Sequence, residues 1–235
     1  MKRFESYGNG VPGTSIEELP GWLIVVEGTD GVGRTTHVNK LRTHLERLGY
    51  AVAETGFTRS DLASRGIHDA KMGNTLGSNA FNLFYATDFA DRLEQQIIPA
   101  LRAGFVMITD RYIYSLIARA IVRGADSAWI KQVYSFALKP DAVFYLRIDV
   151  EELVPRVLAD GGFDYWESGM DMPMGEDLYD SFVQYQSRII RELDGLARDY
   201  QFHTMDATRG VGELADELCE RVTALLTQKV AGSTK

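Results

Sequence analysis

The stretch Gly28–Thr35, which reads GTDGVGRT, constrains the fold of this chain more than any other feature. The apolar run WLIVVEG precedes it, and TTHVNKLRTHL follows it, with Leu41 and Leu45 on one face of an expected helix. A glycine-rich turn between a buried strand and a helix lets successive backbone N–H groups and the positive helix end point at one anion. The pattern therefore predicts a loop that binds phosphate.

One residue departs from the usual phosphate-loop pattern G-x-x-x-x-G-K-[ST], because Arg34 stands where lysine is expected. Thr35 is retained, and its hydroxyl is placed to bind Mg²⁺ beside a nucleotide. Lysine provides a compact charge, whereas arginine is longer, planar and bidentate. The exchange keeps phosphate binding and leaves two functions open: phosphoryl transfer, or nucleotide binding without catalysis.

Strand-like and helix-like segments alternate after the loop, which predicts an α/β fold with a five-stranded parallel sheet covered by helices on both faces. The expected strands are Trp22–Val26, Ala51–Glu54, Phe105–Thr109, Val143–Ile148 and Phe202–Met205. The expected helices are Thr35–Leu48, Asn79–Ala103, Ile113–Leu138, Val150–Ala159, Glu176–Tyr200 and Gly212–Thr227. Pro99 and Gly124 should kink or interrupt the long helices that contain them. Ligands of such a sheet bind beyond the carboxyl ends of its strands.

The chain divides into three parts. Residues 1–20 read as an irregular arm, 21–228 as one domain and 229–235 as a tail. Within the domain, a segment at about 160–177 is rich in glycine, methionine and acidic residues, and reads as a mobile lid between two helices.

Composition narrows the possible partners. The 235 residues carry a net charge of −8 without a basic cluster, which argues against nucleic acid as the main partner. No apolar run approaches the roughly 20 residues that span a bilayer, so no membrane is expected. The lone Cys219 suits a reducing compartment, and we expect a cytoplasmic protein that binds a small molecule.

Further motifs point to a family. The segment FVMITDRY (Phe105–Tyr112) ends an apolar strand in Asp-Arg-Tyr, GFTRS (Gly56–Ser60) follows the second strand, and LFYATDFADRLEQQIIPAL and KPDAVFYLRID lie elsewhere in the domain. Together with EGTDGVGRTT, these segments make the chain from Gly21 to about Leu226 resemble the thymidylate kinases, which are nucleoside monophosphate kinases of the P-loop NTPase fold. The resemblance implies transfer of the γ-phosphoryl group of ATP to a nucleoside monophosphate, with Mg²⁺ and with dTMP as the first candidate.

The resemblance also implies roles for particular residues. Asp30 would meet the acceptor's 3′-hydroxyl or a metal-bound water, Arg59 and Arg111 would bind the acceptor phosphate, and Asp110 would organise Mg²⁺ with Thr35. Arg34, Asp110 and Arg111 would form the catalytic set. The residues expected to bind the ATP phosphates are Gly28, Thr29, Asp30, Gly31, Val32, Gly33, Arg34, Thr35 and Thr36. A homodimer packed through helices near 79–103 and 113–138 is implied as well.

Departures from the family pattern fall on the base and sugar contacts. The family's Phe-x-x-x-Arg becomes Tyr85 and Phe89, so an aromatic ring remains but the arginine that reads thymine is lost. The polar base contact falls on Leu116, and the tyrosine that disfavours a ribose 2′-hydroxyl falls on Arg119. Phe89 and Leu116 could line the pocket or simply pack in the core. A different monophosphate, including a ribonucleotide, therefore stays open as the acceptor.

The lid departs from the family too. Members with glycine at the position of Gly31 supply arginines from the lid, whereas this lid is acidic. We hypothesise that Arg34 provides the positive charge that a lid arginine would give in the transition state, with Arg156 as a weaker candidate.

Overall fold

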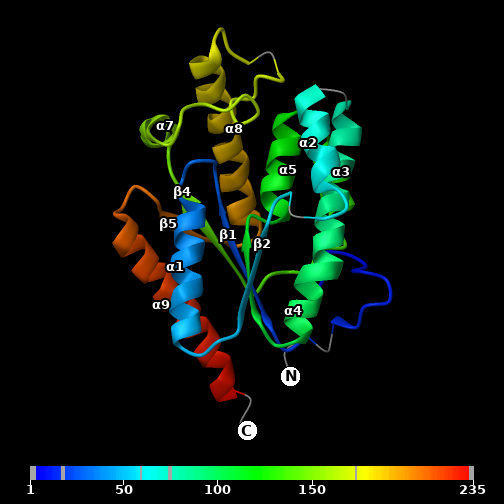
Figure 1. Cartoon of the computed structure of the whole chain (residues 1–235), viewed down its shortest axis with the longest axis vertical. Coiled ribbons are helices and arrows are strands. Elements are labelled where there is room, and N and C mark those ends of the chain that lie inside the picture. The colour runs from blue at the N-terminus through cyan, green and yellow to red at the C-terminus, as the bar shows by residue number, and fades with distance from the viewer. Residues whose placement is uncertain (1–3, 17–18, 59, 74–75, 173, 233–235) are drawn as a thin grey trace.

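A computed structural model describes residues 4–16, 19–58, 60–73, 76–172 and 174–232. The chain forms one parallel five-stranded sheet in the order β2-β3-β1-β4-β5, with helices on both faces (Figure 1). This arrangement confirms the predicted fold class. The strands are β1 (Trp22–Gly28), β2 (Val52–Gly56), β3 (Val106–Asp110), β4 (Ala142–Arg147) and β5 (His203–Asp206). Each expected strand is present, with its ends shifted by at most two residues.

The helices depart from expectation in four places. The predicted helices 79–103 and 113–138 are divided, a short helix at 64–73 was not predicted, and the last helix ends at Gly232, beyond the expected Thr227 and inside the predicted tail. The helices are α1 (Arg34–Arg47), α2 (Ser64–Gly73), α3 (Ser78–Arg92), α4 (Ile98–Arg102), α5 (Ile113–Val122), α6 (Ser127–Val133), α7 (Val150–Ala159), α8 (Leu178–Asp199) and α9 (Val211–Gly232).

Glycine and proline explain the two divisions. Gly124 lies just after α5 and has φ of 88°. This left-handed conformation commonly ends a helix, and glycine adopts it without the steric cost that other residues have. A π-helical turn, η2 (Leu93–Ile97), separates α3 from α4, and Pro99 lies in the first turn of α4. There the missing N–H of proline removes no bond within α4.

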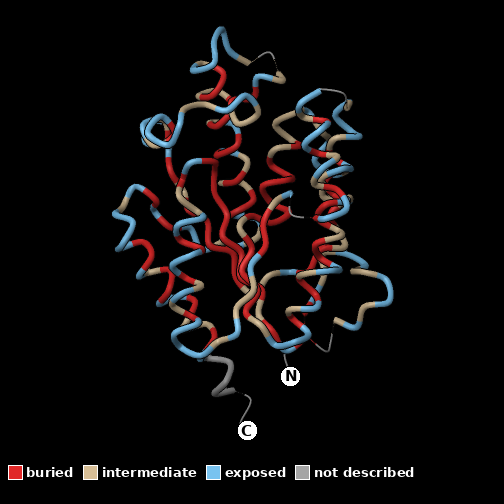
Figure 2. Tube along the Cα trace, in the orientation of Figure 1, coloured by how far each residue is buried: buried red, intermediate tan, exposed pale blue. Residues whose placement is uncertain are grey.

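Alternate residues of β1 build two separate cores. Leu23 and Val25 face the core formed with α3, α4, α5, α6 and α8. Ile24 and Val26 face the core formed with α1, α7 and α9. Side chains of successive strand residues point to opposite faces, so one apolar strand serves both layers. Figure 2 shows the resulting buried centre of the molecule.

The N-terminal arm covers one edge of the first core. Ser6 forms an isolated antiparallel bridge with Leu138, and Phe4 is almost fully buried. The hydroxyl of Tyr7 is hydrogen-bonded to that of Tyr114. Among the described residues, no helix combines the length and apolar character needed to cross a membrane.

A buried ion pair on α3 gives a test of stability. The Asp88 carboxylate accepts from Arg92 Nε at 2.9 Å, and both side chains are at most 1% exposed. Replacing Asp88 by asparagine leaves the guanidinium buried without a counter-ion, and should lower the free energy of unfolding by about 3 kcal/mol in urea titrations.

The control is Asp69→Asn on α2, because Asp69 faces Arg65 with the same i,i+4 spacing but both side chains are largely exposed. Its effect should stay below about 0.5 kcal/mol. An equal loss of unfolding free energy in the two variants would contradict the expectation that a buried ion pair contributes more to stability than an exposed one.

Candidate active site

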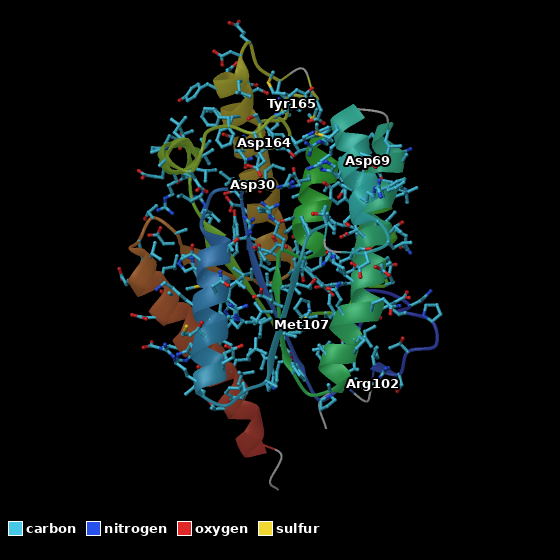
Figure 3. All side chains as sticks on the ribbon, viewed as in Figure 1. Asp30, Asp69, Arg102, Met107, Asp164 and Tyr165 are labelled. Carbon is cyan, nitrogen blue, oxygen red and sulfur yellow. The ribbon has the colours of Figure 1, made fainter. Side chains whose placement is uncertain are left out.

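The register of the sheet brings three loops together. Val26 of β1 and Gly56 of β2 both pair with Asp110, the last residue of β3. The phosphate loop, the loop after β2 and the Asp-Arg-Tyr turn therefore begin at one level of the sheet. In Figure 3, Asp30 lies at this upper end, below Asp164 and Tyr165 of the lid, and Asp69 lies on α2 to the right of it.

The phosphate loop has the backbone conformation that its glycines predict. Gly31 has φ of 75°, and a Cβ there would lie 2.5 Å from Val157 Cγ2 of α7, so a side chain is excluded by both strain and contact. Gly33 precedes α1 with φ of 96°. Val32 is buried in the core beneath the loop, whereas Thr35 and Thr36 are exposed in the first turn of α1.

Arg34 turns its guanidinium back across the mouth of the loop. Nε donates to Asp110 Oδ1 at 2.7 Å, and Nη1 donates to the carbonyls of Gly28, at 2.8 Å, and Thr29. Nη2 lies 4.0 Å from Asp30 Oδ1. A planar fork can satisfy an acid and two carbonyls at once, which a lysine ammonium on its flexible stem is less suited to do.

Thr35 and Asp110 form an oxygen pair beside this guanidinium. Thr35 Oγ1 donates to Asp110 Oδ2 at 3.2 Å. One hydroxyl and one carboxylate fit Mg²⁺, a hard cation that is usually bound by one or two protein oxygens together with phosphate and water. The residue types and their separation therefore suit the predicted metal site.

Asp30 joins two arginines that come from different segments. Arg111, which follows β3, and Arg119 of α5 each donate through Nη2 to the Asp30 carboxylate. Burial and the neighbouring Arg119 lower the pKa of Arg111 to about 9, so its side chain remains a cation at neutral pH. Arg111 also has φ of 70°, which is uncommon outside glycine and recurs at functional turns.

The buried side chain of Glu27 accepts hydrogen bonds from the last residue of the Asp-Arg-Tyr turn and from Ser115, which follows the turn. This role was not predicted from the sequence. Glu27 is fully buried at the end of β1 and accepts from the backbone N–H of Tyr112 at 2.8 Å and from the hydroxyl of Ser115. Burial raises the pKa of Glu27, and these hydrogen bonds oppose the increase. The signal in the sequence is an acidic residue in an otherwise apolar strand, which must find buried donors.

Arg59 lies outside the described residues, but residues on both sides of it make hydrogen bonds to neighbouring elements. The N–H of Ser60 donates to Asp88 Oδ1 at 3.1 Å, and its hydroxyl donates to Asp91 Oδ2 at 2.6 Å. Thr55 Oγ1 of β2 donates to Gln96 Oε1 in the π-helical turn at 2.7 Å. The loop that carries Arg59 is therefore anchored to α3 and η2 on both sides.

A cavity lies among α2, α3, α5 and the lid, with an enclosed volume of about 20 Å³ inside about 400 Å³ of empty space that includes open solvent. Four of its nine described lining residues are aromatic, and three are cationic. Burial, with Arg119 and Arg123 nearby, lowers the pKa of Lys71 to about 8. The lining residues are the aromatic Phe81, Tyr85, Tyr134 and Trp166 and the cationic Lys71, Arg119 and Arg123, together with Asn82 and Leu116.

The residues that were expected to contact the base or sugar of the acceptor fall into two groups. Tyr85, Leu116 and Arg119 line the cavity. Phe89 does not: it is fully buried and contacts the rings of Tyr112, Tyr134 and Phe136. Its placement among the substrate contacts was wrong, because one face of α3 packs in the core and Phe89 lies there.

Arg156 donates to the carbonyl of Ala207 at 2.7 Å, which ties α7 to the end of β5.

The lid reaches the acceptor side of the site. Trp166 stacks on Phe81 of α3, with ring centroids 5.6 Å apart, and the Lys71 ammonium lies 5.6 Å from its ring. Arg123 of α5 donates to the lid carboxylate of Asp171 at 2.9 and 3.1 Å. The lid segment 160–177 contains no arginine or lysine.

Comparisons with known proteins agree on one family. The family model described as Thymidylate kinase matches residues 26–218. The chain is 40% identical over 194 residues to probable thymidylate kinase 2 of Saccharolobus solfataricus, covering 81% of this chain and 90% of the relative. It is 29% identical over 214 residues to the thymidylate kinase of Halothermothrix orenii, covering 88% of this chain and 99% of the relative.

The motifs, the strand order and these matches lead to the same assignment. A phosphate loop precedes the Asp-Arg-Tyr turn, and both meet at the carboxyl edge of a sheet ordered β2-β3-β1-β4-β5. The matched segment spans most of the chain, from residue 26 to residue 218. The chain belongs to the thymidylate kinase family, ATP-dependent phosphotransferases that convert dTMP to dTDP.

Proposed function

We propose that the chain phosphorylates dTMP with Mg²⁺–ATP at the junction of the phosphate loop and the aromatic cavity. The backbone of Gly28–Thr36 binds the ATP phosphates. Arg59 and Arg111 bind the acceptor phosphate, and Asp30 binds the acceptor sugar. The observation that carries the proposal is the convergence of Arg34, Asp110 and Arg111 between the loop and the cavity.

The reaction joins an oxygen of the dTMP phosphate to the γ-phosphorus of ATP, while the bond from that phosphorus to the bridging oxygen breaks and ADP leaves. Such transfer needs in-line positioning and cations around the equatorial oxygens more than it needs a strong base. Arg111 positions the attacking phosphate, and Arg34, released from the carbonyls of Gly28 and Thr29, turns toward the transferred group.

Thr35 and Asp110 would hold Mg²⁺, which would supply positive charge at the ATP phosphates. Asp110 also accepts from Arg34, so its carboxylate would serve both the metal and the guanidinium. The acidic lid cannot add such charge. This supports Arg34 as the residue that compensates for the missing lid arginine.

The test is ADP release from ATP across a panel of nucleoside monophosphates. We expect dTMP to give the highest kcat/KM. A different acceptor with a higher value would contradict the choice of base or sugar. Release no faster than the no-acceptor control, together with a melting temperature that still rises with ATP, would contradict catalysis and favour a nucleotide-binding protein.

A homodimer stays a prediction. Of the two helical segments implied in it, α5 is largely buried within one chain, whereas α3 exposes Leu83 and Phe84. These exposed apolar side chains make α3 the better candidate for the contact. Sedimentation of the purified chain would give its oligomeric state.

A further inference from the structure

The cavity lacks the base-reading groups that the family pattern would place in it. Leu116 is apolar, and Phe89 lies in the core. Yet the cavity opens beside Arg119, which is joined through Asp30 to Arg111. An acceptor whose phosphate meets Arg111 would place its base at this cavity, and other side chains would then recognise it.

Asn82 carries the one side-chain amide among the described residues that line the cavity. It is 8% exposed, and its Nδ2 is buried without a hydrogen-bond partner in the described part of the chain. Buried polar groups are nearly always paired, because an unpaired donor loses its water without compensation. A ligand that accepts from this amide would satisfy it.

Most of the remaining polar groups of the cavity are donors, and only the hydroxyls of Tyr85 and Tyr134 among its described lining residues can also accept. Lys71, Arg119 and Arg123 are cationic, and none of its described lining residues carries a carboxylate. The surroundings therefore favour a base edge rich in carbonyl oxygens. Thymine has two carbonyls that flank an N–H, and an asparagine amide can donate to one of them while accepting from that N–H.

Trp166 is placed to cover the base. Its ring stacks on Phe81 at an interplanar angle of 26°, and its carbonyl accepts from Arg123 at 3.2 Å. Phe81 and Asn82 are neighbours on α3, so one turn of this helix offers both a ring wall and an amide. A base slotted against these groups is enclosed by aromatic faces.

We propose that Asn82 is the specificity-determining residue for the acceptor base, pairing its side-chain amide with the carbonyl and N–H edge of thymine, while Trp166 of the lid covers the ring. The inference rests on the proposed function for the identity of the acceptor. It assigns base recognition to α3 and the lid.

Two variants of Asn82 test the assignment by titration calorimetry with dTMP. Leucine removes donor and acceptor at similar volume, and aspartate keeps the acceptors but loses the donor. Each should weaken dTMP binding roughly 10- to 100-fold and leave ATP binding unchanged. Without nucleotide, Asn82→Leu should melt close to wild type, because the lost donor had no described partner.

The matched control is Asn79→Leu, one helical turn earlier on α3 and exposed, which should bind dTMP as wild type does. Trp166→Ala should weaken dTMP binding about tenfold, and Trp166→Phe should restore most of it. Unchanged dTMP affinity in both Asn82 variants would overturn the assignment. A wild type that binds dTMP but releases no ADP would contradict the proposed function alone, since the binding comparison still decides the role of Asn82.

Discussion

Arg34→Ala is expected to lower kcat by about 10³-fold with a much smaller change in ATP affinity. The guanidinium contacts Asp110 and two carbonyls of the phosphate loop, so it lies beside the loop without being part of its row of backbone N–H groups. The backbone N–H groups that bind phosphate remain in the variant. Single-turnover kinetics and calorimetry with Mg²⁺–ATP separate the two effects.

Arg34→Lys decides whether the arginine compensates for the acidic lid. An ammonium keeps the charge but loses the planar fork, so we expect at least a tenfold lower kcat. The control is Arg42→Ala on α1, whose side chain is 37% exposed and pairs with Glu54, and which should change kcat little. A lysine variant faster than wild type would contradict the compensation.

The sequence was sufficient for most of the fold because β1 and its neighbours are apolar throughout, which is typical of strands buried on both faces. The prediction from sequence failed for elements whose ends or presence depend on tertiary contacts. Helix α2 is short, and Ile67, Ala70 and Met72 are its only apolar residues, so it gives too short a pattern to mark a helix. The break at Gly124 was foreseen, but its position alone could not tell a kink from the end of a helix.

The phosphate loop was predicted more fully than the acceptor pocket. Gly31 and Gly33 act through local backbone geometry, which a motif records. Asn82 and Trp166 meet across two segments that are far apart in the sequence, and neither belongs to a motif. Phe89 lies on the face of α3 that packs in the core. Which face of the helix is buried depends on how the helix packs, and the spacing of residues in the sequence did not predict it.

Arg111→Ala is expected to lower kcat/KM for dTMP by about 10³-fold while ATP affinity changes by less than about twofold. Arg111 is 7% exposed and donates to Asp30, at the point where the phosphate loop meets the cavity. Its loss removes a bidentate cation from the acceptor phosphate. Asp30 keeps its bond to Arg119, so the buried carboxylate is not left unpaired and the fold should persist.

Chemical rescue distinguishes a direct phosphate contact from a structural role. Added guanidinium ion at non-denaturing concentration should restore part of the activity of Arg111→Ala, because the vacated volume can accept the missing group. The matched control is Arg102→Ala, since Arg102 is exposed at the opposite end of the sheet (Figure 3) and neither its removal nor added guanidinium should alter kcat/KM. Loss of activity in Arg111→Ala without rescue, accompanied by a fall in melting temperature, would mean that Arg111 supports the turn after β3 and does not contact the acceptor.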